Sequence, residues 1–184
     1  MSEAPRVPAL APERFTPEQR ELVGDWATLN FSKVIINHPA MYRVFVPYIA
    51  AVIAGSSLPP RDREVLVVRT LGLGGDTYEM HHHVQISEKA GMPAAEVTAM
   101  ARGEVSDPWE RLLVQAADEL VQGHELTRPT WAALAERYTR EQVMEVVFLV
   151  GCYSTMAMLT RSFDMAVEDD PETEAKLREL REYT

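Results

Sequence analysis

Helix-start signals recur along the chain, and no segment shows the alternation of apolar and polar residues that is typical of a strand. Thr16, Pro17 and Gln19 combine a capping residue, a proline at the first helical position and a glutamine at the capping-box position. The helix that they start is expected to run to about Asn30. Further start signals stand at His38-Pro39, Pro59-Pro60, Asp76, Asp107-Pro108 and Thr139. The sequence therefore predicts an all-α fold with seven or eight helices.

The composition is that of a packed globular chain. It has 184 residues, of which 46% are hydrophobic and 25% charged, and these values exclude a disordered protein. The proline-rich residues 1–15 lack a periodic apolar pattern, so we expect an extended N-terminal arm. Residues 16–170 are predicted to form a single helical domain, and residues 171–184 a charged C-terminal tail.

Charge, apolar stretches and cysteine content restrict the partners and the location. The formal net charge of −10 repels phosphates, so a nucleic-acid partner is not expected. The longest apolar stretch, residues 143–159, is shorter than the roughly 20 residues that span a bilayer. It predicts a buried core helix, in which Glu145 pairs with a cation, and no membrane partner. The single cysteine, Cys152, allows no intrachain disulfide, and no secretory signal pattern is found, so a cytoplasmic location is expected.

The titratable side chains that stand out lie on the predicted helix over residues 76–90. Asp76, Glu79 and His83 are spaced three and then four residues apart, which places them on one helix face. Glu64 lies on the preceding helix, and a hairpin of the two helices packs it back against the next one. A carboxylate against an imidazole is a proton-transfer pair. A purely structural role for His83, and capping roles for Asp76 and Glu79, stay open as alternatives.

Metal and nucleophile chemistry find little support in the sequence. Successive helical residues point about 100° apart, so the adjacent His81, His82 and His83 cannot converge on one ion. Glu79 and His82 match half of a di-iron site, but the second Glu-x-x-His that such a site needs is missing. Cys152 lies in the most apolar helix, where desolvation makes a thiol inert. We therefore predict no metal and no cofactor, and we expect His81 to face solvent.

The stretch RDREVLVVRTLGLGGDTYEMHHHVQISEKAGM, residues 61–92, resembles the signature hairpin of the carboxymuconolactone decarboxylase family. The resemblance continues through DPWERLLVQAADEL, PTWAALAERY and EQVMEVVFLVGCY, and covers roughly residues 38–165. It implies an oligomeric alkylhydroperoxidase D-like helical bundle. The pair Tyr78 and Glu79, followed by His82 and His83, is its most specific part.

The resemblance also implies roles for individual residues. In the peroxidase branch of this fold, a glutamate precedes a Cys-x-x-Cys-x-x-x-His motif. Glu64 matches the relay glutamate and His83 the relay histidine, while Asp76 and Glu79 stand at the two cysteine positions. Carboxylates cannot form a disulfide, so a thiol peroxidase is not expected.

What remains is similar to the decarboxylase branch, which implies a cofactor-independent lyase acting on a small carboxylated or unsaturated lactone or an aromatic-derived compound. In this interpretation His83 donates a proton to carbon, Glu64 orients it, Glu79 completes the relay and Tyr78 binds an oxyanion. Candidates for substrate binding are Asp76, His82 and Arg69. Other arginines that could hold a substrate carboxylate are Arg43, Arg61, Arg63 and Arg161.

Two other functions are compatible with the same residues. One is an isomerase or dehydratase for a related substrate, and the other is a non-catalytic ligand-binding or assembly subunit that keeps the family fold. For all of them the resemblance implies a homotrimer or a homohexamer.

Overall fold

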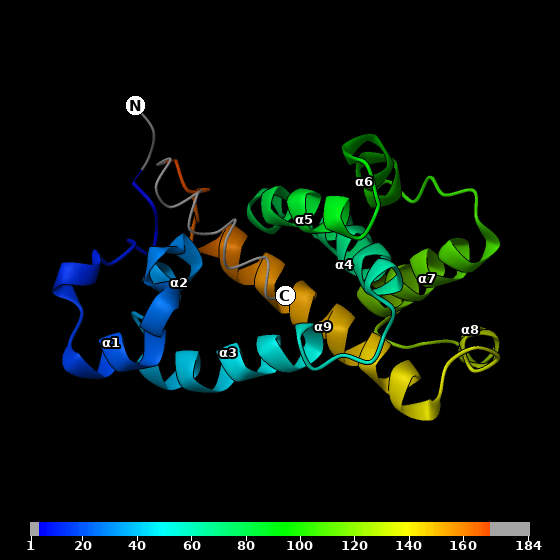
Figure 1. Ribbon diagram of the computed structural model, residues 1–184, viewed down its shortest axis with the longest axis horizontal. Helices are drawn as coiled ribbons and strands as arrows, with labels where there is room; N and C mark the ends of the chain where they lie inside the picture. Colours follow the sequence, from blue (N-terminus) through cyan, green and yellow to red (C-terminus); the bar gives the residue numbers. More distant parts are fainter. Residues whose placement is uncertain (1–3, 170–184) are drawn as a thin grey trace. The chain divides into compact units, whose positions relative to one another are not determined.

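The computed structural model describes residues 4–169, and among these every regular element is a helix (Figure 1). The prediction of an all-α fold is therefore confirmed. The chain divides into two compact units, one made of Met1–Ala54 and Leu159–Thr184 and the other of Gly55–Met158. The predicted single domain over residues 16–170 stays a prediction. The charged tail predicted for residues 171–184 lies outside the described residues.

The first unit holds the N-terminal helices. Its elements are η1 (Pro12–Arg14), α1 (Pro17–Val23), η2 (Gly24–Thr28), α2 (Asn30–Ile35) and α3 (Pro39–Ile53). Thr16 and Gln19 form the predicted capping box. The first helix ends at Val23 and not near Asn30, because Gly24 adopts a positive φ of 53° that breaks the helical path.

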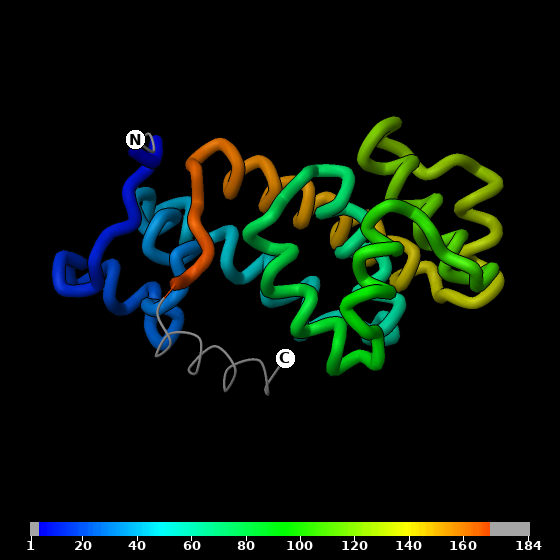
Figure 2. The backbone as a smooth tube through the Cα atoms, turned by 90° about the horizontal axis from the view of Figure 1, so that it is seen from above, coloured from blue at the N-terminus to red at the C-terminus, as the bar shows by residue number. Residues whose placement is uncertain are grey.

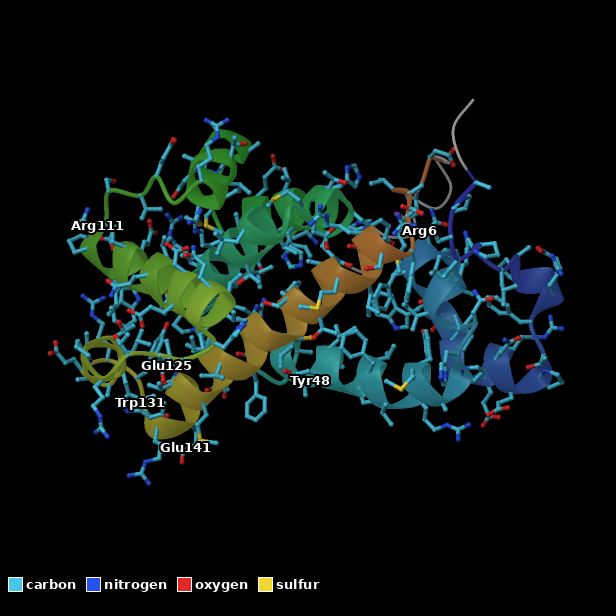
Figure 3. All side chains as sticks on the ribbon, turned by 180° about the vertical axis from the view of Figure 1, so that it is seen from behind. Arg6, Tyr48, Arg111, Glu125, Trp131 and Glu141 are labelled. Atoms are coloured by element: carbon cyan, nitrogen blue, oxygen red, sulfur yellow. The ribbon has the colours of Figure 1, made fainter. Side chains whose placement is uncertain are left out.

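The described part of the N-terminal arm is fixed against its own unit. The backbone N–H of Leu10 donates to the carbonyl of Lys33, and the side-chain amide of Asn37 donates to the carbonyl of Pro8. Arg6, labelled in Figure 3, binds the carboxylate of Asp164 through its backbone N–H at 3.2 Å. These contacts hold the arm in place without a regular helix longer than one turn.

The second unit is built around α4 (Pro60–Gly74). This helix packs against α5 (Thr77–Lys89), α6 (Ala94–Ala101) and α7 (Pro108–Asp118), and the backbone path is seen in Figure 2. Its apolar side chains are buried on several sides, namely Val65, Leu66, Val67, Val68 and Leu71. The remaining elements are η3 (Glu119–Gly123), α8 (Arg128–Leu134) and the part of α9 (Arg140–Ser162) that lies before residue 159.

A tight turn joins α4 to α5 and sets the geometry of the candidate site. Gly75 ends α4 with a left-handed φ of 62°, a conformation that glycine adopts at little cost. Asp76 then caps α5, because its Oδ1 accepts from the backbone N–H groups of Tyr78 and Glu79 at 2.9 and 3.1 Å. The predicted helical hairpin is therefore present, with both of its ends set by local sequence.

Helix α9 is the long apolar helix that the sequence predicts. By length and composition it passes as a membrane span, but half of the apolar stretch is buried inside the chain, as in a core helix. Among residues 4–169, Glu145 has no cation as a partner, contrary to the prediction. It accepts hydrogen bonds from the hydroxyl groups of Ser56 and Ser57 and from the backbone N–H of Ser57.

Candidate active site

The centre of the candidate site is the contact between Glu64 on α4 and His83 on α5. Their Oε2 and Nδ1 atoms lie 2.8 Å apart, and the two residues are 1% and 3% exposed. Ser87, one turn beyond His83, donates its hydroxyl to the same Oε2 at 3.1 Å. The structure thus brings together the carboxylate and the imidazole that the hairpin spacing predicts.

A buried arginine also lies near Glu64. The Nε atom of the neighbouring Arg63 lies 3.8 Å from Oε1 of Glu64, and Arg63 is itself buried. The contact of Nδ1 with Glu64 fixes the ring orientation of His83. With Nδ1 occupied, Nε2 is the ring atom that can exchange a proton with a ligand.

Tyr153 on α9 packs against His83, a contact that the sequence does not predict. The ring centroids lie 5.0 Å apart at 84°, an edge-to-face contact, and Tyr153 is 1% exposed. Burial, followed by the negative charges of Glu64 and Glu79, raises the pKa of the Tyr153 hydroxyl well above its usual value. This hydroxyl therefore keeps its proton at neutral pH and can act as a hydrogen-bond donor.

Cys152 precedes Tyr153 and is completely buried. Burial, with a smaller contribution from the charge of Glu79, raises the pKa of the Cys152 thiol to about 12. At neutral pH only a negligible fraction is thiolate, which is the nucleophilic form. The thiol is therefore inert, as the sequence predicts.

Asp76 and Glu79 extend the acidic side of the site toward the start of α5. Both side chains are buried, and the charge of Glu79 acts on Cys152 and Tyr153. Asp76 fills its capping role through Oδ1, whereas its Oδ2 is buried without a hydrogen-bond partner among the described residues. An additional donor, from a ligand or a water molecule, would satisfy that oxygen.

Tyr78 and His82 face each other on another side of α5. Their ring centroids lie 4.8 Å apart in an edge-to-face contact, and both residues are buried. The ring found against His83 is that of Tyr153 and not that of Tyr78. The four-residue spacing of Tyr78 and His82 is the sequence signal for this pairing, since such residues meet on a helix surface. His81 is exposed, as expected.

Arg69, a predicted substrate-binding residue, contacts two other helices of its unit. Its Nε donates to Oδ1 of Asp118 at 2.6 Å, and its Nη1 donates to the carbonyl of Ala101 at 2.9 Å. These contacts tie α4 to α6 and α7. The guanidinium is engaged in these contacts, and its predicted role in substrate binding stays a prediction.

The donor groups of the site do not form a metal centre. Within residues 4–169, no group of three histidine, cysteine, aspartate or glutamate side chains is arranged to hold a metal ion. The arrangement is suited to proton transfer, since a buried imidazole contacts a carboxylate and the ring of a tyrosine.

The described helices have an alkylhydroperoxidase D-like fold. A structure of an alkylhydroperoxidase AhpD core, an uncharacterized peroxidase-related protein from Ralstonia eutropha JMP134, is similar with a TM-score of 0.76 and 21% identity, over 97% of this chain and 98% of that one. An uncharacterized peroxidase-related protein from Silicibacter sp. TM1040 has a TM-score of 0.74 and 12% identity, over 96% and 97% of the two chains.

The sequence itself matches a family model. Residues 39–122 match the model of the carboxymuconolactone decarboxylase family. The resemblance inferred from the hairpin is therefore confirmed. No curated protein matches the sequence.

Proposed function

We propose that this protein is a cofactor-independent enzyme that catalyses proton transfer at carbon, of the carboxymuconolactone decarboxylase type. The supporting observation is the buried 2.8 Å contact between Glu64 and His83. The substrate class that fits is a small carboxylated or unsaturated lactone or an aromatic-derived compound, and the reaction is a carbon–carbon cleavage.

The proposed step is protonation of a carbanion by His83. In a carboxylated unsaturated lactone, the bond to the carboxylate breaks and its electron pair moves into the conjugated carbonyl, with CO₂ as the leaving group. Nε2 of His83 then gives its proton to carbon. Glu64 holds the ring through Nδ1, which leaves Nε2 as the ring atom that gives the proton.

A hydrogen-bond donor is needed to stabilise the negative charge that develops on the carbonyl oxygen. Tyr153 keeps its proton and lies against His83, so it is a further candidate for this role beside Tyr78, the residue favoured from the sequence. Glu79 adds negative charge to the same site, and we assign it to the relay that returns a proton to His83 after each turnover.

A thiol peroxidase is less compatible with the site, although both structural neighbours are named as peroxidase-related proteins. The chain has one cysteine, and its thiol is buried with a pKa of about 12. Asp76 and Glu79 stand where the family's redox branch has its two cysteines. The acid/base half of that site is retained without the residues that form the disulfide.

The proposal includes an assembly and a location. Exposed apolar side chains on α3 and α9 support the expected homotrimer or homohexamer, namely Met41, Val44, Met144, Phe148 and Met158. We further propose a cytoplasmic enzyme with a small-molecule substrate and without a nucleic-acid or membrane partner, consistent with the net charge of −10.

The test is turnover of a panel of carboxylated and unsaturated lactones, followed by ultraviolet absorbance and product chromatography. We expect His83→Gln and Glu64→Gln to lower kcat/KM by at least about 100-fold, the lower end for a general acid or base. His81→Gln, at an exposed position of the same helix, is the matched control and should retain the wild-type rate.

Two results would contradict the proposal. One is a wild-type rate in His83→Gln together with loss of activity in His82→Gln, which would move the catalytic face of α5. The other is a folded protein that turns over no member of the panel, which would favour a ligand-binding subunit.

A further inference from the structure

A surface hollow of about 240 Å³ lies between α4, α5 and α6, apart from the Glu64 and His83 pair. We infer that this hollow is a binding site for a small apolar carboxylate. The inference is independent of the proposed chemistry, because neither Glu64 nor His83 lines the hollow. The lining residues are Gly72, Met80, Val84, Val97, Thr98, Ala101 and Arg102.

The floor of the hollow is the close crossing of α4 and α6. A Cβ atom added at Gly72 would lie 2.3 Å from the carbonyl oxygen of Ala101, so only glycine allows this approach. The carbonyl of Ala101 is also fixed by the hydrogen bond from Arg69. The hollow is therefore framed by rigid backbone.

The walls are apolar. Met80 and Val84 lie one turn apart on α5, and Val97, on α6, is completely buried. Pockets that take drug-sized ligands measure roughly 300 to 1,000 Å³. A hollow of about 240 Å³ therefore favours a smaller ligand with an apolar body, such as a phenyl ring or a short alkyl chain.

The positive charge of Arg102, one of the lining residues, favours a negatively charged ligand. Arg102 ends α6 and is exposed, and it forms no ion pair or hydrogen bond through its side chain with another described residue. Two other arginines of this unit are engaged: Arg61 binds Glu96 and Glu110, and Arg69 binds Asp118. None of the described residues that line the hollow is a carboxylate. An apolar surface below an unpaired guanidinium is complementary to an apolar ligand with one carboxylate.

The experiment is a titration with phenylacetate that is read at the Met80 methyl group. The wild-type protein carries ¹³C-labelled methionine methyls, and Met80→Leu assigns the Met80 resonance by its loss. We expect a saturable shift of this resonance with a millimolar Kd. The neutral analogue phenylacetamide should bind at least about tenfold more weakly, because it lacks the charge that pairs with Arg102.

Matched variants test the assignment. Arg102→Gln should weaken phenylacetate binding about tenfold, whereas Arg128→Gln, at another exposed arginine of the same unit, should leave it unchanged. His83→Gln should bind phenylacetate as the wild type does. Thr98→Trp should fill the hollow and abolish the Met80 shift for both ligands.

Each other outcome overturns the inference. Equal binding by Arg102→Gln and wild type, or equal binding of the amide and the carboxylate, would remove the role of the guanidinium. Loss of binding in His83→Gln would place phenylacetate in the acid/base site. A Met80 shift that follows protein concentration and not phenylacetate would identify the hollow as a contact between copies of the chain.

Discussion

The substitution Gly72→Ala tests the close crossing of α4 and α6. Gly72 lies inside α4, and alanine at an ordinary helix position is more stable than glycine by roughly 0.5 to 1 kcal/mol. Here the added Cβ would lie 2.3 Å from the carbonyl oxygen of Ala101 and 3.0 Å from its carbonyl carbon. These are backbone atoms, so no side-chain rotation relieves the overlap.

The two effects have opposite signs, and their sizes decide the outcome. Overpacking of a close-packed interior costs about 1 to 3 kcal/mol. Subtracting the gain in helix propensity leaves a net destabilisation of up to about 2.5 kcal/mol. The sign is therefore the reverse of that expected for a glycine-to-alanine change in a helix.

The assay is urea unfolding followed by far-ultraviolet circular dichroism at one fixed protein concentration, since an oligomer's stability depends on concentration. We expect a lower midpoint and an unchanged m-value for Gly72→Ala. Gly123→Ala is the control, because a Cβ there meets nothing within 4 Å and the position has no positive φ. A Gly72→Ala protein at least as stable as wild type, with Gly123→Ala not destabilised, would refute the rigid floor of the hollow.

Three further predictions concern other parts of the chain. Burial raises the pKa of Glu145, but the hydrogen bonds from Ser56 and Ser57 outweigh this effect, so the pKa is lowered. Glu145→Gln should therefore cost about 1 kcal/mol of stability at pH 7. Denaturant unfolding should show that the difference from wild type vanishes as the pH falls through the lowered pKa. Cys152, with a pKa of about 12, should resist iodoacetamide at pH 8 in the folded protein and react in urea, as measured by mass spectrometry; rapid labelling of the folded form would contradict its burial. Light scattering at micromolar concentration should give the mass of a trimer or a hexamer, and a monomer would rule out the proposed assembly.

The helix boundaries around the site were predictable because single residues set them. Pro60 starts α4, Gly75 ends it and Asp76 caps α5, and each of these residues acts through local backbone geometry. The end of the first helix was not predictable in the same way. Gly24 carries the positive φ, but a glycine inside a helical pattern can also continue the helix.

The candidate site was predictable only where its residues share a hairpin. Glu64 and His83 meet because the turn between them is short, so their register follows from helical spacing. Tyr153 comes from a helix far along the chain, and nothing in its spacing indicates which face of α9 meets His83. The sequence around Arg69 and Arg102 does not show which of the two guanidinium groups forms hydrogen bonds. Only the packing of α4 against α6 and α7 shows that one is engaged and the other is not.

The short separation of Glu64 and His83 has a consequence for the order of folding. The two residues are 19 positions apart, so their contact closes a short loop, and each doubling of loop length costs about 0.6 kcal/mol more in chain entropy. Contacts between residues close in sequence also form faster than distant ones. The acid/base contact therefore joins neighbouring helices, whereas the contact with Tyr153 needs a residue that is synthesised 70 positions after His83.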